Sequence, residues 1–371
     1  MTPSGEELLD TLENIFRKYT IQQSRHEYTA LALYVVFTHA IEHFDFATRL
    51  LITSAEKRSG KTRTMTILSN LVKDPLITAN ATVAAINRSL GAENSRTLCF
   101  DEADTIFGTK MKAEQNEELR GILNSGFQRG TPALRVNGLT NQVDEFDTFA
   151  PAVLCAIGTL PDTVVDRAVN IRLRRRKNGE TVADYRIRRD QPGLHDVREA
   201  VSQWVAGHRD SFDFFDYDGL DNPLNDRAAD VWEPLLTVGS VAGLRWAHKA
   251  KEAAIYFARA SAENDVETSP GMELLADIRS VLSMVRAEKV QSSNLISLLT
   301  SLEESRWGEE GLSAKRLSSL LKPYGIHSVR IARGSARGYE VSSFQDVFER
   351  YLPPSPDLSD NPTANLDIAG E

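Results

Sequence analysis

The chain has little cysteine, no excess of basic residues and no long apolar run. Its two cysteines, Cys99 and Cys155, lie inside apolar stretches, where a free thiol behaves as a small core residue. The formal net charge of −9 excludes a surface that is basic throughout, so any nucleic-acid contact must come from local patches. No apolar run approaches the ~20 residues that cross a bilayer, and the N-terminal segment is acidic where a signal peptide is basic. We therefore expect a cytoplasmic protein that has no contact with a membrane.

The first half of the chain has the pattern of an α/β domain. Its 371 residues, 41% of them hydrophobic, can form two or three domains with buried cores. Residues 1–45 carry apolar positions at helical spacing and predict two helices. Over residues 46–180, short β-type runs alternate with helical stretches, which predicts a parallel sheet covered on both faces. The expected strands are residues 49–53, 76–80, 97–100, 152–158 and 168–173.

The second half is mainly helical. Residues 181–262 predict a helical lid, interrupted only by Gly, Asp, Asn and Pro turns. Residues 263–352 have the order helix, helix, helix, two short strands and a last helix, which is typical of a winged-helix domain. The Pro- and Asp-rich residues 353–371 are expected to be disordered.

The segment AEKRSGKT, residues 55–62, follows an apolar strand and precedes a helical stretch. A phosphate-binding loop (P-loop) reads GxxxxGK[ST], and Ala55 stands where its first glycine would be. In such a loop, backbone N–H groups surround the phosphates of a nucleotide, the lysine neutralises their oxygens and the hydroxyl binds Mg²⁺. The residues expected to bind the nucleotide are Ser59, Gly60, Lys61 and Thr62, with Thr62 also a ligand of Mg²⁺.

Two acids support this interpretation. The apolar run TLCF, residues 97–100, ends in Asp101 and Glu102, about forty residues after the loop. In P-loop NTPases an acid at this strand end holds Mg²⁺, and a neighbouring glutamate orients and deprotonates the attacking water. We assign these roles to Asp101 and Glu102. The alternative is that both residues only cap the helix that follows.

Three residues farther along are candidates for sensing or stabilising a phosphoryl group. Thr159 ends the fourth strand, where ring ATPases carry a polar residue, and it is otherwise a turn hydroxyl. Arg167 precedes the fifth strand, where such rings place an arginine that stabilises charge in the neighbour's site; a surface ion pair with a nearby aspartate is the alternative. Arg227 opens a helix of the lid and is expected to reach the phosphates of its own chain. A local ion pair with Asp226 or Asp230 is equally compatible with its position.

The chain contains further arginine-bearing segments between and after these strands. Arg129 and Arg135 lie in an insertion before the fourth strand and are candidates for contacts with a neighbouring subunit or with a central pore; the alternative is a solvated surface. The cluster RLRRRK, residues 172–177, ends the fifth strand. Residues 311–339 contain no acid, and this charge would fit DNA phosphates, although winged helices also dock proteins. The residues expected to contact DNA there are Lys315, Arg316, Arg330, Arg333 and Arg337.

These segments together resemble a family of actinobacterial and phage P-loop ATPases that carry a C-terminal domain of unknown function and occur in helicase-primase-like proteins. The shared runs include LPDTVVDRAVNIRLRRR, NDRAADVWEPLLTVGSVAG, LSAKRLSSLLKPYGI and GYEVSSFQDVFERYL. The resemblance implies a P-loop ATPase of the additional-strand, AAA+-like type that forms a ring, with ATP as the nucleotide. It assigns Lys61, Thr62, Asp101, Glu102 and Arg167, together with Arg227, to the roles given above. No primase module is present in the chain, so priming would come from another protein.

The leading hypothesis is a hexameric, ring-forming, Mg²⁺-dependent ATP hydrolase that moves or remodels DNA, such as a replicative helicase of a phage or mobile element acting in the bacterial host cytoplasm. Two alternatives stay open, namely an ATPase switch that does not translocate and a DNA-binding regulator with a degenerate P-loop. The first glycine of a P-loop permits a particular backbone conformation, whereas later amides hold the phosphates. We therefore expect Ala55 at negative φ, with its methyl group directed away from the phosphates.

Overall fold

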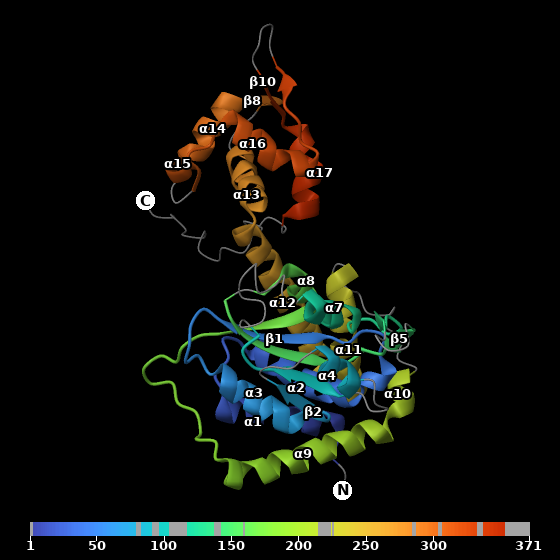
Figure 1. Cartoon of the computed structure of the whole chain (residues 1–371). Helices are drawn as coiled ribbons and strands as arrows, with labels where there is room; N and C mark the ends of the chain where they lie inside the picture. Colours follow the sequence, from blue (N-terminus) through green and yellow to red (C-terminus); the bar gives the residue numbers. More distant parts are fainter. Residues whose placement is uncertain are drawn as a thin grey trace, which may run out of the picture. The chain divides into compact units, whose positions relative to one another are not determined.

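The computed structural model of the chain (Figure 1) describes residues 3–78, 83–90, 96–103, 117–136, 142–158, 160–213, 224, 226–283, 287–302, 306–331 and 337–352. The chain divides into two compact units, one ending at Ala258 and one beginning at Arg259. The expected tail, residues 353–371, lies outside the described residues.

The first unit is built on a five-stranded sheet (Figure 1). The strands lie in the order β2-β3-β6-β1-β7 and every neighbouring pair is parallel. All five strands were predicted, with ends that differ by at most two residues. Their bounds are β1 Arg49–Ser54, β2 Pro75–Thr78, β3 Thr97–Phe100, β6 Ala152–Ile157 and β7 Ala168–Leu173. Strand β6 separates β1 from β3, so the loop after β1 and the acids after β3 come from strands that are not neighbours.

Both faces of the sheet are covered, as the sequence predicts. Alternate strand residues point to opposite faces. Leu50 and Ile52 belong to a core that they share with helices α1, α2, α3, α9, α11 and α12, whereas Leu51 belongs to a second core with α4, α7 and α8. The helices are α1 Gly5–Tyr19, α2 Arg25–His39, α3 Lys61–Leu71, α4 Val83–Leu90, α7 Glu117–Ser125, α8 Asp162–Val165, α9 Ile187–Gly207, α10 Arg209–Asp213, α11 Asp226–Ala242 and α12 Leu244–Thr268.

The segment predicted as a helical lid does not form a body of its own. Helix α9 packs on α2 and α3, α11 packs on α2, and their apolar side chains join the core beneath the sheet. Helix α1 is fixed to α12 in the same unit, because Asp10 accepts hydrogen bonds from Arg245 at 2.6 Å and from the indole of the fully buried Trp246 at 3.1 Å. The N-terminal helices, the sheet and the following helices are therefore one folded unit up to Ala258.

A hairpin is inserted between β3 and β6. Strands β4, Ala133–Val136, and β5, Val143–Phe146, pair antiparallel in a sheet of their own. Leu134, Val136 and Val143 are each more than half exposed on it.

The second unit has its own core and its own small sheet. Three of its helices, the two short strands and the last helix follow the predicted order, and strand β8 and helix α15 were not predicted. Strand β8 has only three residues, too few for a periodic pattern, and it forms by pairing with β10. The elements are α13 Pro270–Ser283, β8 Lys289–Gln291, α14 Ser292–Thr300, α15 Arg306–Glu310, α16 Ala314–Leu321, β9 Val329–Arg330, β10 Arg337–Glu340 and α17 Ser342–Tyr351.

Candidate nucleotide-binding site

The loop between β1 and α3 turns without its first glycine. Among the described residues other than glycine, positive φ occurs at Arg58 (65°), Asp74 (35°) and Glu102 (60°), so Ala55 is at negative φ as expected. Gly60, at φ 96°, is the N-cap of α3 and accepts a hydrogen bond from the Thr64 N–H at 3.0 Å. The unusual backbone angles of the loop are thus at Arg58 and Gly60. A left-handed backbone conformation costs a residue with a side chain roughly 1–2 kcal/mol. Such strained residues are typical of functional loops.

Lys61 lies in the first turn of α3 and points into the loop. Its ammonium donates to the hydroxyl oxygen of Ser54 and lies 3.5 Å from both the Glu56 carbonyl oxygen and the Ser59 hydroxyl oxygen. Phosphate oxygens of a nucleotide would interact with the same ammonium at the positive end of the α3 dipole. The Thr62 side chain is exposed beside it.

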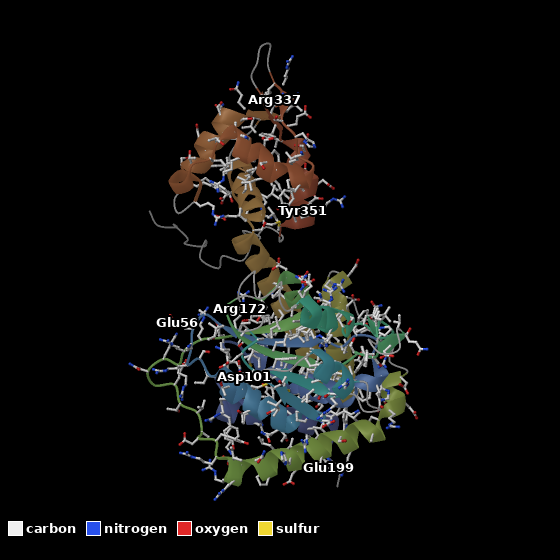
Figure 2. The ribbon with its side chains drawn as sticks, viewed as in Figure 1. Glu56, Asp101, Arg172, Glu199, Arg337 and Tyr351 are labelled. Carbon is white, nitrogen blue, oxygen red and sulfur yellow. The ribbon has the colours of Figure 1, made fainter. Side chains whose placement is uncertain are left out.

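Arg175 holds the outer part of this loop, and the sequence reasoning missed this contact. Its guanidinium forms an ion pair with the Glu56 carboxylate at 2.6 Å and donates to the Lys57 carbonyl oxygen at 3.1 Å. Arg175 belongs to the cluster of residues 172–177, which begins at the end of β7, the strand next to β1. Glu56, Arg172 and Asp101 lie toward the same end of the sheet in Figure 2.

Asp101 and Glu102 follow β3 at this carboxyl end of the sheet. Glu102 is exposed at positive φ, and its backbone N–H donates to the Asp101 carboxylate at 3.1 Å. Burial raises the pKa of the Cys155 thiol on β6, and the charges of Asp101 and Lys61 change that pKa in opposite directions. The charges of Asp101 and Lys61 therefore both reach Cys155 on β6, the strand between β1 and β3. The helix that the two acids were alternatively expected to cap would begin outside the described residues.

A groove of about 370 Å³ connects Thr62 with Asp101. It runs between α3 and α9 and opens beside the edge strand β2. In it, the Asn70 amide oxygen accepts a hydrogen bond from Gln191 at 2.8 Å and lies 3.0 Å from the His195 Nε2. Both residues expected to bind Mg²⁺ thus line one space. An oxygen pair of this kind, completed by phosphate and water oxygens, suits Mg²⁺.

Arg167 lies at the opposite end of the sheet. It precedes β7, whose Ala168 pairs with Arg49 at the amino end of β1, whereas Ser54 at the carboxyl end pairs with Leu173. The guanidinium donates to the Thr163 carbonyl oxygen at 2.7 Å and lies 5.7 Å from the centre of the Phe127 ring. The five steps between the six residues of β1, at about 3.3 Å each, separate the two ends by roughly 17 Å.

Arg227 lies beside Arg167 and away from Lys61. Its guanidinium is 5.8 Å from the centre of the same Phe127 ring and 3.4 Å from the Asp230 carboxylate. Helix α11, which it opens, is held at the amino end of β1, because Thr48 donates to the Val231 carbonyl oxygen at 2.7 Å. The expected contact from Arg227 to a phosphate on its own chain does not fit this arrangement. The local ion pair that the sequence also allowed is present.

The two arginines influence each other electrostatically. Burial lowers the pKa of the Arg167 guanidinium, and the positive charge of Arg227 is the second cause in the same direction. The charge of Asp166 changes the same pKa in the opposite direction. Thr159, the third candidate of this group, lies outside the described residues.

Arg129 has a structural role that the sequence did not reveal. Its guanidinium donates to the Phe44 and Ile41 carbonyl oxygens at 3.0 Å each and stacks 4.3 Å from the centre of the Phe149 ring. The expected contact with a neighbour or a pore does not fit these internal bonds. Arg135 lies on β4, and its side chain is outside what the structure describes.

The expected DNA-binding residues of the second unit differ in how they are held. Arg330 and Arg337 pair across β9 and β10, and Arg337 also donates to the Ser328 carbonyl oxygen at 2.6 Å. Arg316 donates to the Gly311 carbonyl oxygen at 3.1 Å and lies over the ring of Trp307, so part of its role is internal. Lys315 is exposed near the start of α16, and Arg333 lies outside the described residues.

No helix among the described residues is long and apolar enough to cross a membrane. Within the same residues, no three His, Cys, Asp or Glu side chains gather as a metal site.

Comparison with known proteins finds relatives of this chain. Residues 172–351 match a family described as "Protein of unknown function (DUF3631)". The "Uncharacterized 28.9 kDa protein in xis 5'region" of Saccharopolyspora erythraea is 37% identical over 190 residues, which are 50% of this chain and 70% of that protein. The family match begins within β7, so Lys61, Thr62, Asp101 and Glu102 precede it, whereas Arg227 lies within it.

Two solved structures show a distant likeness to the chain. A structure described as "SCCmec type IV Cch - active helicase" has a TM-score of 0.41 at 12% identity, over 85% of this chain and 68% of that chain. The apo structure of the "NrS-1 C terminal region" has a TM-score of 0.42 at 12% identity, over 92% of this chain and 77% of that chain.

Proposed function

The chain belongs to the DUF3631 family, and we propose that it is an ATP hydrolase that assembles as a ring and moves or remodels DNA. One observation carries the proposal. The loop with Lys61 and the paired arginines lie at opposite ends of the same sheet, roughly 17 Å apart along β1. A chain with both halves of a phosphoryl-transfer site, but on opposite sides, completes the site only with a second copy. Repetition of such a head-to-tail contact forms a ring when the rotation between neighbouring copies closes, which is the arrangement proposed here.

Each half has a separate task in this proposal. Gly60 and Lys61 bind the phosphates at the N-terminus of α3, and Thr62 with Asp101 hold Mg²⁺. Bound Mg²⁺ would neutralise charge on the β- and γ-phosphate oxygens. Glu102 accepts the proton of the attacking water. Because β6 lies between β1 and β3, the loop and the acids come from strands that are not neighbours, which is the order that the additional-strand type implies.

Arg167 and Arg227 act on the neighbour's nucleotide. Both guanidiniums lie near one aromatic ring and repel each other, so together they favour an anion such as the transferred γ-phosphoryl group. An arginine supplied from another subunit is a known means of phosphoryl-transfer catalysis. The Arg227 assignment replaces the contact within one chain that the sequence suggested.

The first test concerns the nucleotide half. We expect Lys61→Ala and Glu102→Gln each to lower the ATPase rate by about a hundredfold or more, because each removes a group that acts directly on the phosphates or on the water. Lys57→Ala is the matched control, since Lys57 is an exposed side chain of the same loop. Unchanged turnover in both variants would contradict the site assignment.

The second test asks on which chain Arg227 acts. Arg227→Ala and Lys61→Ala should each be inactive alone, and an equimolar mixture should regain about a quarter of the wild-type rate. Random mixing places an intact loop against an intact arginine at that fraction of the interfaces. If Arg227 acted on its own chain, the mixture would stay inactive.

DNA is the proposed partner of the second unit. Helix α16 with the strand pair β9–β10 carries Lys315, Arg330 and Arg337 on a fold whose order is that of a winged helix. DNA-stimulated hydrolysis with strand displacement would support translocation. Nucleotide-dependent assembly without stimulation by DNA would instead favour an ATPase switch.

A further inference from the structure

Phe127 is an aromatic residue that lies near both Arg167 and Arg227. Its side chain is 1% exposed, and its ring centre lies 5.7 Å from the Arg167 guanidinium and 5.8 Å from that of Arg227. The ring also packs against Phe46, with 5.4 Å between ring centres. One aromatic side chain thus contacts both cations at the amino end of the sheet.

The backbone around Phe127 is firmly fixed. The Ala47 N–H donates to the Phe127 carbonyl oxygen at 2.7 Å, immediately before β1. Gly126 packs so closely on Thr148 that an added Cβ would lie 2.1 Å from its carbonyl oxygen. Arg129, two residues after Phe127, donates to the Phe44 and Ile41 carbonyl oxygens. The ring is therefore presented from a rigid part of the unit rather than from a mobile loop.

We propose that Phe127 is the positioning residue that holds Arg167 and Arg227 together, ready for the phosphate of a neighbouring copy. The inference rests on the proposed function. Two guanidiniums that repel each other need an attractive partner to stay close, and the face of an aromatic ring attracts cations. Thr163 and Asp230 each orient one arginine, whereas Phe127 is shared by both.

The ring has an advantage over an acidic partner at this place. A carboxylate held equally close to both arginines would neutralise them and compete with the phosphate. An aromatic ring attracts the same cations without neutralising them, and the Asp230 carboxylate pairs with Arg227 alone. The aromatic character of residue 127, and not only its bulk, should therefore determine catalysis.

The experiment compares Phe127→Leu, Phe127→Met and Phe127→Tyr in the full chain. Leucine and methionine keep an apolar side chain but remove the ring, and tyrosine keeps the ring. We expect leucine and methionine to lower kcat roughly two- to thirtyfold, the range of a lost cation–π interaction, with KM for ATP within about twofold of the wild type. Tyrosine should retain kcat within about twofold. Phe149→Leu, which removes the ring beneath the structural Arg129, is the matched control and should leave kcat near the wild-type value.

Mixing experiments separate positioning from simple loss of stability. A Phe127→Leu subunit keeps an intact loop, so adding Lys61→Ala subunits, which supply intact arginines, should raise its activity. Adding Arg167→Ala subunits should not raise the activity, because these subunits lack one of the two arginines. Methionine fills the volume flexibly and serves if the leucine variant does not fold.

The outcomes separate a failure of the Phe127 role from a failure of the proposed function. The role of Phe127 would be overturned if folded Phe127→Leu or Phe127→Met had the wild-type kcat, or if mixing with Lys61→Ala subunits gave no gain in activity. The proposed function would still stand in that case, provided that Arg167→Ala and Arg227→Ala are impaired. A wild-type chain without ATPase activity would overturn both.

Discussion

At the scale of single residues, two of the three described non-glycine residues with positive φ lie where the chemistry is proposed. Arg58 and Glu102 have positive φ, and both flank the carboxyl end of the sheet. Left-handed backbone at residues with side chains persists only where the surroundings enforce it. The sequence showed that Ala55 lacks the freedom of glycine, but only the folded loop showed that Arg58 and Gly60 make the turn instead.

His39 makes the stability of the first unit sensitive to pH. It is 7% exposed on α2, its Nε2 lies 2.9 Å from the Leu71 carbonyl oxygen, and burial lowers its pKa from 6.5 to about 4. A depressed pKa means that the unfolded chain binds more protons between pH 6.5 and 4, so this stabilisation is present above pH 6.5 and is lost toward pH 4. The shift corresponds to about 3 kcal/mol.

We expect His39→Gln, which can still donate to Leu71 but does not titrate, to flatten this dependence in urea unfolding at pH 7.5 and pH 5. Comparison of the variant with the wild type is essential, because burial raises the pKa of Glu27 on the same helix to about 7. That shift has the opposite sign, with stability falling as the pH rises from about 4.5 to 7. Identical pH profiles for the two proteins would contradict the assignment to His39.

At the scale of elements, strand β1 organises the proposed chemistry. One end leads into the loop with Lys61, and the other end adjoins the arginine pair and Phe127. The local sequence predicted the five strands of the parallel sheet, since apolar runs are local signals, whereas β8 and the β4–β5 hairpin were not predicted. It could not predict which end of the sheet would receive α11, because that depends on packing against α2.

Helix α16 and strand β9 allow a prediction about DNA. We expect Lys315→Ala and Arg330→Ala each to weaken DNA binding similarly for all sequences and to lower the slope of log K against log salt by about 0.9, the value for one lost phosphate contact. Fluorescence anisotropy over a salt series measures this slope. The control is Lys289→Ala, because Lys289 on β8 already pairs with Glu340 at 2.9 Å. Equal effects of all three substitutions would indicate general electrostatics instead of a defined surface.

At the scale of the whole molecule, the two units have separate apolar cores. Leu317 is fully buried in the core of the second unit, and Leu33 is fully buried in that of the first. We expect two transitions in urea unfolding, with Leu317→Ala lowering one of them and Leu33→Ala lowering the other, each by about 2–5 kcal/mol. Circular dichroism and tryptophan fluorescence follow both. A single transition that shifts in both variants would show that the units unfold together.

The sequence by itself determined the five strands, the loop with Lys61, the acids after β3 and the order of the second unit, because each depends on neighbouring residues. The tertiary structure alone decided that Arg227 lies beside Arg167, that Arg129 is bonded internally, that Arg175 holds the loop and that the expected lid shares the core of the sheet. These contacts join residues far apart in the chain. They follow from strand order and helix packing, for which a local pattern contains no signal.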